Sequence, residues 1–328
     1  MKTLSISVAA YNMEKLIRQN LDSFVNSSVR DDIEVLVVND GSKDGTAQIA
    51  AEHEAKYPGV VKLINQENAG PGSTVNRGIE HASGRYFRMV DADDWVGDGF
   101  DEYVSSLRSF DADMIVTNYI CVDDKTGQTQ KVRINGLKNK KTVDFESVCS
   151  SLSLEMHAVT FKTDILKQNN IRLFNGFYTD IQYLLFPSQY VKTVMYIDCD
   201  VYMYRVSLSG QSMSVPSMQR NIKMHDDMLF SIAALYNSIK DVRPPVAQYV
   251  LKKLIYISGT QLGTLLSFEP SRDNKKRLFD YIMRLKSQCP DAYVGFCRYK
   301  TARALRFLNG AFYPLISRMH RKRLEIEK

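Results

Sequence analysis

The stretch IEVLVVNDGSKDGT (33–46) joins a run of apolar, β-branched residues to a polar turn and then to a segment that is compatible with a helix. A short apolar run of this kind is typical of a buried strand. Its carboxyl end carries Asp40 directly before a glycine, and Asp44 stands where it could cap a helix over residues 44–57. The stretch therefore predicts a strand–turn–helix unit with an acidic turn at the carboxyl end of the strand.

The same unit recurs along the first 120 residues. Further strand-like runs lie at 4–11, 60–65, 85–91 and 112–119, and further helix-compatible segments lie at 14–27, 72–83 and 98–110. Strands that alternate with helices of this length predict an α/β fold with a mainly parallel sheet. Ligands of such sheets bind beyond the carboxyl ends of the strands. The polar turns fall at these ends: YN (11–12), NDGS (39–42), NAGPG (68–72) and DADD (91–94).

Beyond residue 120 the pattern changes. The segment DDKTGQTQK (123–131) predicts a hairpin turn, and from about residue 216 apolar residues recur at helical spacing. We therefore predict two domains, an α/β domain over residues 1–215 and a mostly helical region with a basic end over residues 216–328.

Composition and charge limit the class of protein. The chain has 328 residues, of which 44% are hydrophobic and 24% charged, as in ordinary globular proteins. It shows no apolar run long enough to span a membrane and no secretion signal at its start, so we expect a cytoplasmic protein. The five histidines show no metal-binding spacing and are interpreted as structural or surface residues.

The turn DADD carries three carboxylates in four positions, Asp91, Asp93 and Asp94. Taken alone, an acidic turn is often a solvated loop whose aspartates cap the next helix. Mg²⁺ and Mn²⁺, however, bind hard oxygen ligands, typically one or two carboxylates together with water and phosphates. Because two further polar turns are expected at the same edge of the sheet, the sequence favours a divalent-cation site with room for a diphosphate.

The order VAAYN (8–12), VVNDGSKDGT (37–46), NAGPGSTVNRGI (68–79) and ASGRYFRMVDADDW (82–95) resembles the nucleotide-sugar domain of family 2 glycosyltransferases. That family has the Rossmann-like GT-A fold and an Asp-x-Asp motif. A looser resemblance covers residues 161–186 and 204–214. The resemblance implies a donor half over residues 1–120 and an acceptor half over residues 121–215.

The activity that this resemblance implies is that of an inverting, metal-dependent hexosyltransferase. It would move one sugar from a nucleoside diphosphate sugar, expected to be a UDP-sugar, to a glycan or a lipid-linked saccharide in bacterial polysaccharide or cell-envelope synthesis. The cofactor would be Mn²⁺ or Mg²⁺, which stabilises the negative charge that develops on the departing diphosphate.

The resemblance also implies residue roles. Asp93 would bind the metal directly, Asp91 would contact the metal or the ribose, and Asp180 would be the catalytic base. The remaining expected contacts are Asp40 with the uracil, Ala10, Tyr11 and Asn12 on one wall of the nucleotide pocket, Gly70 and Asn76 on the other, Arg205 at the diphosphate, and Trp95 and Asp94 toward the acceptor.

Other interpretations stay open. The family's Glu-Asp pair reads Thr179-Asp180 here, so Asp180 could simply cap a helix. Arg205 could be a surface ion-pair partner and Trp95 a core residue. A nucleotidyltransferase would share the sheet, the metal and the nucleotide, and a nucleotide-sugar-binding protein without activity would share the whole donor site. A Rossmann dehydrogenase is disfavoured, because no G-x-G-x-x-G follows the first strand.

The basic end forms a separate feature. Residues 296–323 hold eight Lys or Arg and no acid, interleaved with aromatic and aliphatic residues. We expect this segment to lie on an anionic membrane, which would make the protein peripheral at the inner face of the membrane. A packed helix pair with a solvated basic face is the alternative. Nucleic-acid binding is not expected, because no known nucleic-acid module accompanies the charge. A homo-oligomer is left open.

Overall fold

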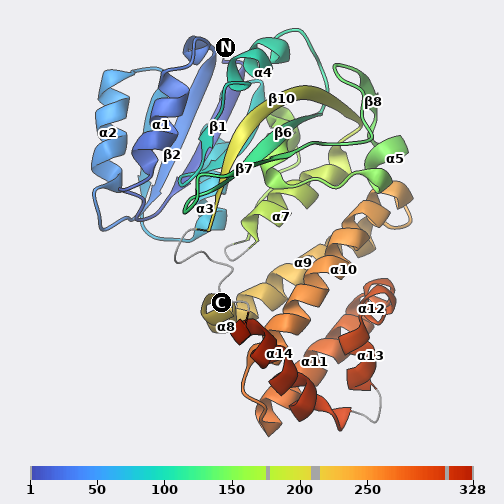
Figure 1. The fold of residues 1–328 in the computed structure, drawn as a ribbon. Coiled ribbons are helices and arrows are strands. Elements are labelled where there is room, and N and C mark those ends of the chain that lie inside the picture. Colours follow the sequence, from blue (N-terminus) through green and yellow to red (C-terminus); the bar gives the residue numbers. More distant parts are fainter. Residues whose placement is uncertain (1, 175–177, 208–214, 307–309, 327–328) are drawn as a thin grey trace. The chain divides into compact units, whose positions relative to one another are not determined.

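The structure is a computed structural model that describes residues 2–174, 178–207, 215–306 and 310–326 (Figure 1). The chain divides into two compact units, Met1–Ser209 and Gly210–Lys328. The first holds the sheet and the second is built from helices. The expected domain boundary after residue 215 stays a prediction.

Over the ranges described above, the first unit contains ten strands. They are β1 (Leu4–Ala10), β2 (Ile33–Asp40), β3 (Val61–Gln66), β4 (Tyr86–Asp91), β5 (Trp95–Val96), β6 (Met114–Asp123), β7 (Thr129–Val132), β8 (Thr142–Asp144), β9 (Val159–Lys162) and β10 (Thr193–Val206). They form one sheet in the order β3-β2-β1-β4-β9-β6-β10-β5, with β7 on β6 and β8 on β10. Strands β1 to β4 pair in parallel, and so do β6 and β10. The predicted α/β fold with a mainly parallel sheet is confirmed.

The helices of this unit follow the strands. They are α1 (Ile17–Val25), α2 (Thr46–Lys56), α3 (Pro71–His81), α4 (Phe100–Leu107), α5 (Phe145–Val148), α6 (Thr163–Gln168) and α7 (Thr179–Leu185). Helix α1 forms because Ile17, Leu21 and Phe24 recur at helical spacing and bury one face. Helix α3 lies very close to β1: a Cβ at Gly78 would come within 2.0 Å of the Ser7 hydroxyl oxygen.

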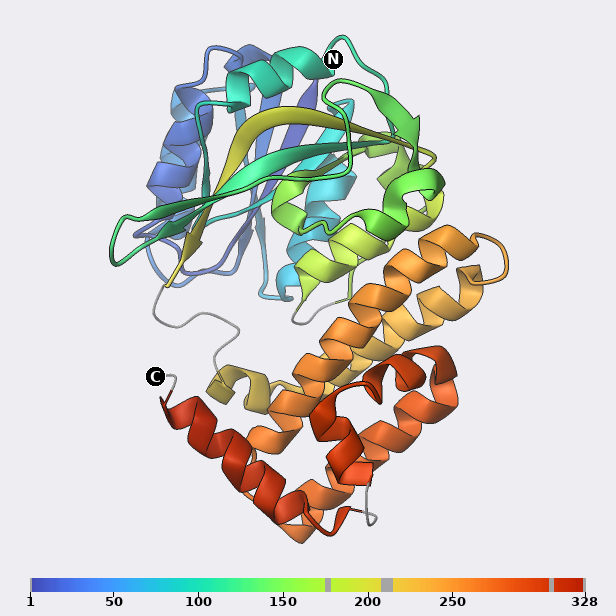
Figure 2. The same cartoon turned by 45° about the vertical axis from the view of Figure 1, so that its right-hand side comes forward.

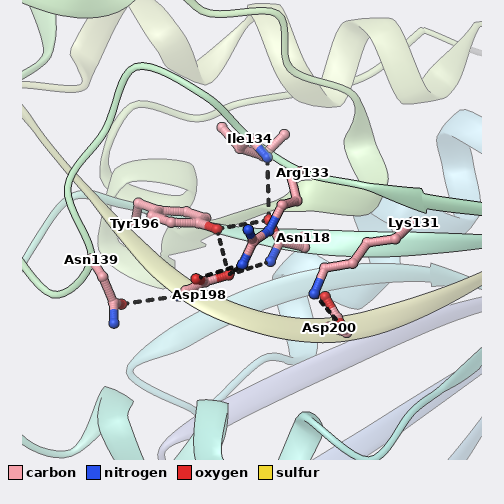
Figure 3. Close-up of polar contacts among 8 residues, drawn as sticks. All are labelled: Asn118, Lys131, Arg133, Ile134, Asn139, Tyr196, Asp198 and Asp200. Atoms are coloured by element: carbon pink, nitrogen blue, oxygen red, sulfur yellow. Dashed lines mark hydrogen bonds and ion pairs between the residues drawn. The ribbon is translucent and has the colours of Figure 1, made fainter.

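The long strands β6 and β10 run side by side in both views (Figures 1 and 2). As predicted, β6 turns back through a hairpin into β7, with Gly127 at a φ of 70°. The middle of β10 changes register twice against β6. There Asp198 accepts hydrogen bonds of 2.8 Å from both Asn118 and Tyr196, and pairs with Arg133 at 3.0 Å (Figure 3). These contacts fix the connector that follows β7 against β10.

The second unit is helical, as predicted for the C-terminal region. Its helices are α8 (Val215–Arg220), α9 (Ile222–Ile239), α10 (Pro244–Ser267), α11 (Arg272–Gln288), α12 (Pro290–Phe296), α13 (Lys300–Arg306) and α14 (Tyr313–Ile326). Helix α10 is the centre of the unit and contacts α8, α9, α11, α12 and α14. Among the residues that the structure describes, none of the helices combines the length and the apolar character needed to cross a bilayer.

Candidate functional site

The acidic turn lies at the carboxyl end of β4, beside β1, where the sequence predicts a ligand crevice. Asp94 is only 2% exposed. Its Oδ2 accepts a hydrogen bond of 2.6 Å from the Tyr202 hydroxyl, and its Oδ1 accepts one of 2.7 Å from the backbone N–H of Arg205. Asp94 therefore ties the turn to β10, and its predicted contact with the acceptor stays a prediction.

Helix α1 holds the same turn from the other side. The buried amide of Asn20 donates to the backbone carbonyls of Asp91 and Asp94, at 3.1 and 2.8 Å. The Tyr202 hydroxyl accepts from the backbone N–H of Asp91 at 3.1 Å. The turn is thus fixed by α1 and β10 together, which presents its carboxylates in a set arrangement.

A histidine joins the carboxylates. Within the described ranges, a carboxylate oxygen each from Asp91 and Asp94 and a ring nitrogen of His157 lie within 4.8 Å of one another. The His157 ring stacks on Tyr204, with ring centres 4.0 Å apart. Burial and then the charge of Arg88 lower the pKa of His157 to about 3, so the imidazole is neutral near pH 7. A neutral imidazole can bind a metal ion.

The charges of the site call for a cation. Burial and then repulsion by Asp93 and Asp180 raise the pKa of Asp91 to about 8. Burial also raises the pKa of Asp93. A bound divalent cation would relieve this repulsion, and the oxygen-rich donor set fits Mg²⁺ or Mn²⁺. Asp180 lies in the first turn of α7, and its predicted role as the base stays a prediction.

Arg205 makes several hydrogen bonds and one aromatic contact within the protein. Its Nε donates to the backbone carbonyl of Asp93 at 2.9 Å, its Nη1 to Asp124 at 2.6 Å and its Nη2 to Gln19 at 2.6 Å. Its guanidinium also lies over Trp95, 4.7 Å from the ring centre. Arg205 therefore braces the acidic turn, and its predicted contact with the diphosphate stays a prediction.

The expected nucleotide side lies at the ends of β1 and β2. Asp40 is 3% exposed, and its two carboxylate oxygens accept from the backbone N–H groups of Ala69 and Gly70, at 2.8 and 2.9 Å. Gly70 has a φ of 88°, which a glycine adopts without strain. Asp40 thus shapes the glycine-rich loop, and its predicted bond to a uracil stays a prediction.

The first wall of this side comes from residues 10–12. Ala10 ends β1 and is buried, whereas Tyr11 is 47% exposed. The side-chain oxygen of Asn12 accepts from the backbone N–H of Lys43 at 2.8 Å, which links the turns after β1 and β2. Tyr11 is therefore accessible to solvent, and its predicted place in the nucleotide pocket stays a prediction.

Asn76 connects the two halves of the unit. Its side-chain amide exchanges two hydrogen bonds of 2.9 Å with the backbone of Leu173, shortly before α7. Gln182 in turn accepts from the backbone N–H of Phe174 at 2.7 Å. These contacts hold the backbone of Leu173 and Phe174, so Asn76 has a structural role in addition to its predicted place beside the donor.

The sequence interpretation did not single out His157, Tyr202 or Asn20. His157 lies in a segment without a metal-binding pattern, and Tyr202 and Asn20 read as ordinary strand and helix residues. Each reaches the acidic turn only through the tertiary fold. The buried amide of Asn20 on an otherwise apolar helix face is the one signal that a sequence reader could have used.

Comparisons with known proteins identify the family of the first unit. The model of Glycosyl transferase family 2 matches residues 5–168. EpsH of Bacillus subtilis is 39% identical over 126 residues, which are 38% of this chain and 36% of that protein. A poly(ribitol-phosphate) beta-glucosyltransferase of Bacillus spizizenii is 38% identical over 96 residues, 29% of this chain and 15% of that protein. The chain thus spans about a third or less of the length of these relatives.

One solved structure resembles the chain over nearly its whole length. It is TarS 1-349 of S. aureus in complex with UDP-GlcNAc, with a TM-score of 0.65 and 18% identity, over 98% of this chain and 92% of that one. At this identity the likeness concerns the fold, and it extends through the helical C-terminal region.

Proposed function

Because the chain belongs to glycosyl transferase family 2 and is therefore a glycosyltransferase, we propose that it transfers one sugar, with inversion, from a UDP-sugar to a saccharide. One observation carries the proposal. Carboxylate oxygens of Asp91 and Asp94 lie within 4.8 Å of each other at the carboxyl edge of the sheet, and burial, followed by repulsion from Asp93 and Asp180, raises the pKa of Asp91 to about 8. A site that concentrates negative charge in this way suits a cation and a diphosphate.

On the donor side, Asp91 and Asp93 would hold the divalent ion, and Asp94 and His157 lie close to the Asp91 carboxylate. The ion would supply positive charge for the departing diphosphate. Tyr202 and Asn20 keep the turn in place before the reaction begins. The glycine-rich loop that Asp40 shapes would close over the nucleotide.

On the acceptor side, Asp180 acts as the base. The acceptor hydroxyl oxygen attacks the anomeric carbon, the bond from that carbon to the diphosphate oxygen breaks, and the hydroxyl proton passes to the Asp180 carboxylate. One displacement of this kind inverts the anomeric centre. Trp95, beside the turn, is proposed to contact the acceptor.

The acceptor is proposed to be a glycan or a lipid-linked saccharide of the bacterial cell envelope. The name of the poly(ribitol-phosphate) beta-glucosyltransferase, a relative over 96 residues, supports this setting. A peripheral contact of residues 296–323 with the inner face of the membrane would bring the site to a lipid-linked acceptor. Exposed apolar residues on α14 support that contact.

A screen of nucleotide sugars with Mn²⁺ tests the donor. A ligand at 100 times its dissociation constant stabilises the folded state by about 2.7 kcal/mol, so the correct donor raises the midpoint of thermal unfolding. The stabilising sugar is then incubated with enzyme and metal, and slow release of UDP is measured. In a separate incubation with UTP and a sugar 1-phosphate, release of pyrophosphate would indicate a nucleotidyltransferase. Stabilisation without any release would indicate a binding protein that lacks activity.

A further inference from the structure

An open cleft of about 500 Å³ lies on the first unit beside the acidic turn. It is lined by Arg18, Gln19, Asp22, Ser23, Asn26 and Trp95. We propose that this cleft is a saccharide-binding subsite that takes a neutral sugar unit of the acceptor, away from the hydroxyl that reacts. The inference rests on the proposed function, because it assumes that the acceptor is a glycan.

The cleft owes its character to the two faces of α1. One face is buried against the sheet, and the side chains that fall on the other lie at positions 18, 19, 22, 23 and 26. This spacing places them in a stripe along one side of a helix. The stripe contains a guanidinium, two amides, a carboxylate and a hydroxyl, so donors and acceptors alternate over a short distance.

The balance of charge indicates the class of ligand. Arg18 and Asp22 are the two charged side chains of the lining, and they have opposite signs. Each also has a partner that does not line the cleft. Arg18 forms an ion pair with Glu52, and Asp22 lies 3.1 Å from a ring nitrogen of His53. A polyphosphate would need an excess of cations. Mixed donors and acceptors without net charge suit the hydroxyl groups of a neutral sugar.

Trp95 adds the apolar part of such a site. Arg205 covers one face of the indole, while the ring also lines the cleft. A sugar ring has an apolar face of C–H groups that packs on an aromatic surface, and its hydroxyls bond to polar groups around it. An indole bordered by amides, a carboxylate and a guanidinium provides both kinds of contact. The volume is within the range of small-molecule sites.

The cleft is connected to the reaction site through two residues. Gln19 accepts from Arg205 Nη2, and the backbone N–H of Arg205 donates to Oδ1 of Asp94. Arg205 also donates to the carbonyl of Asp93. A sugar unit bound at Gln19 therefore lies one side chain away from the acidic turn, as expected for an acceptor that extends from the site of transfer.

The chain contains a single tryptophan, Trp95, so its fluorescence reports on the cleft directly. The test titrates the full chain with glucose, N-acetylglucosamine, maltose, cellobiose and chitobiose, and with glucose 6-phosphate as a charged comparison. We expect a saturable change with at least one neutral sugar. Arg18→Ala and Asn26→Ala should each weaken that binding by about fivefold, as expected for the loss of one hydrogen bond. Asn135→Ala removes an exposed asparagine after β7 and is the matched control.

Three results would overturn the inference: no saturable response to any neutral sugar, tighter binding of the sugar phosphate, or equal affinity in the cleft variants and the control. Release of UDP from the donor is measured separately on the unaltered chain. If UDP is released but Trp95 does not respond, the subsite is wrong and the proposed function stands. If Trp95 responds but no donor is turned over, the proposed function is wrong and the cleft is still a sugar site.

Discussion

Tyr202 and Asp94 lie 108 positions apart in the chain, and the Tyr202 hydroxyl donates a hydrogen bond of 2.6 Å to Oδ2 of Asp94. The same hydroxyl accepts from the backbone N–H of Asp91. Tyr202 and Asp94 are almost completely buried, so no water replaces this bond when it is lost. One hydroxyl group on β10 thus holds two parts of the acidic turn.

Replacing Tyr202 with Phe should therefore destabilise the protein. The change leaves a buried carboxylate oxygen and a buried N–H without their partner, which costs about 1–3 kcal/mol. Urea unfolding of the full chain measures the loss. Tyr190→Phe, at a position that is 39% exposed, is the control. A loss no larger than that of the control would show that the Tyr202 hydroxyl does not brace the turn.

The metal assignment predicts the behaviour of Asp93→Ala. Without this carboxylate the divalent ion loses a direct protein ligand, so the dependence of UDP binding on Mn²⁺ should be strongly reduced. Calorimetry with and without Mn²⁺ measures it. Asp98→Ala removes an exposed carboxylate just past the turn and should leave the dependence intact. Unchanged dependence in Asp93→Ala would refute the assignment.

The base assignment predicts a separation of binding from turnover. Asp180→Asn keeps the shape of the side chain and removes its capacity to accept a proton. Affinity for the donor should be retained, while transfer should fall by about 10²-fold or more. Asp164→Asn, an exposed aspartate in α6, is the control. Turnover close to that of the unaltered chain would move the base elsewhere, with Asp94 as the next candidate.

The sequence predicts those strands and helices whose pattern lies within one short stretch of the chain. The units at the start of the chain repeat within about thirty residues, and β1, β2 and β4 lie where their apolar runs predict them. The position of β9 between β4 and β6 is different, because it depends on pairing between segments far apart in the chain. The same holds for the 14-residue strand β10, which the sequence analysis did not predict.

In the candidate site, too, residues that are adjacent in sequence could be predicted, and residues from distant segments could not. The carboxylates of Asp91, Asp93 and Asp94 are adjacent in sequence, so their place at a strand end could be read directly. What surrounds them could not, because Tyr202 and His157 come from distant segments. A side chain whose contact in the folded state lies far away in the sequence leaves no motif in the residues around it.

Acid should destabilise the protein through His225 on α9. This side chain is 1% exposed, and burial lowers its pKa to about 4, from 6.5 in an exposed histidine. Above pH 6.5 the group is neutral in both states and costs nothing. Between pH 6.5 and 4 the unfolded chain takes up the proton first, so the free energy of unfolding falls by on the order of 3 kcal/mol.

The variant His225→Leu tests this assignment. Its free energy of unfolding should fall less between pH 7 and pH 4.5 than that of the unaltered chain, by about 2 kcal/mol or more. Urea titrations at the two pH values provide the comparison. Equal losses in both proteins would mean that other groups cause the acid sensitivity.

The basic end should bind anionic membranes through α14. Leu315 and Met319 are 56% and 65% exposed, and Phe312, just before the helix, is 44% exposed. Arg318 and Lys322 are exposed at neighbouring helical positions, so one side of α14 carries both apolar and positive side chains. Such a helix lies in the headgroup region of a bilayer, with its cations near the lipid phosphates.

Sedimentation of the full chain with vesicles tests this contact. We expect binding to anionic vesicles at low salt, weaker binding as salt rises, and little binding to neutral vesicles, because each cation near the surface contributes about 1 kcal/mol. Arg318→Glu with Lys322→Glu should weaken binding about thirtyfold or more, and Leu315→Gln with Met319→Gln should weaken it even at low salt. Met283→Gln, which changes an exposed apolar residue on α11, is the control. If both double variants pellet like the control, α14 does not contact the membrane, and its exposed side chains serve another surface.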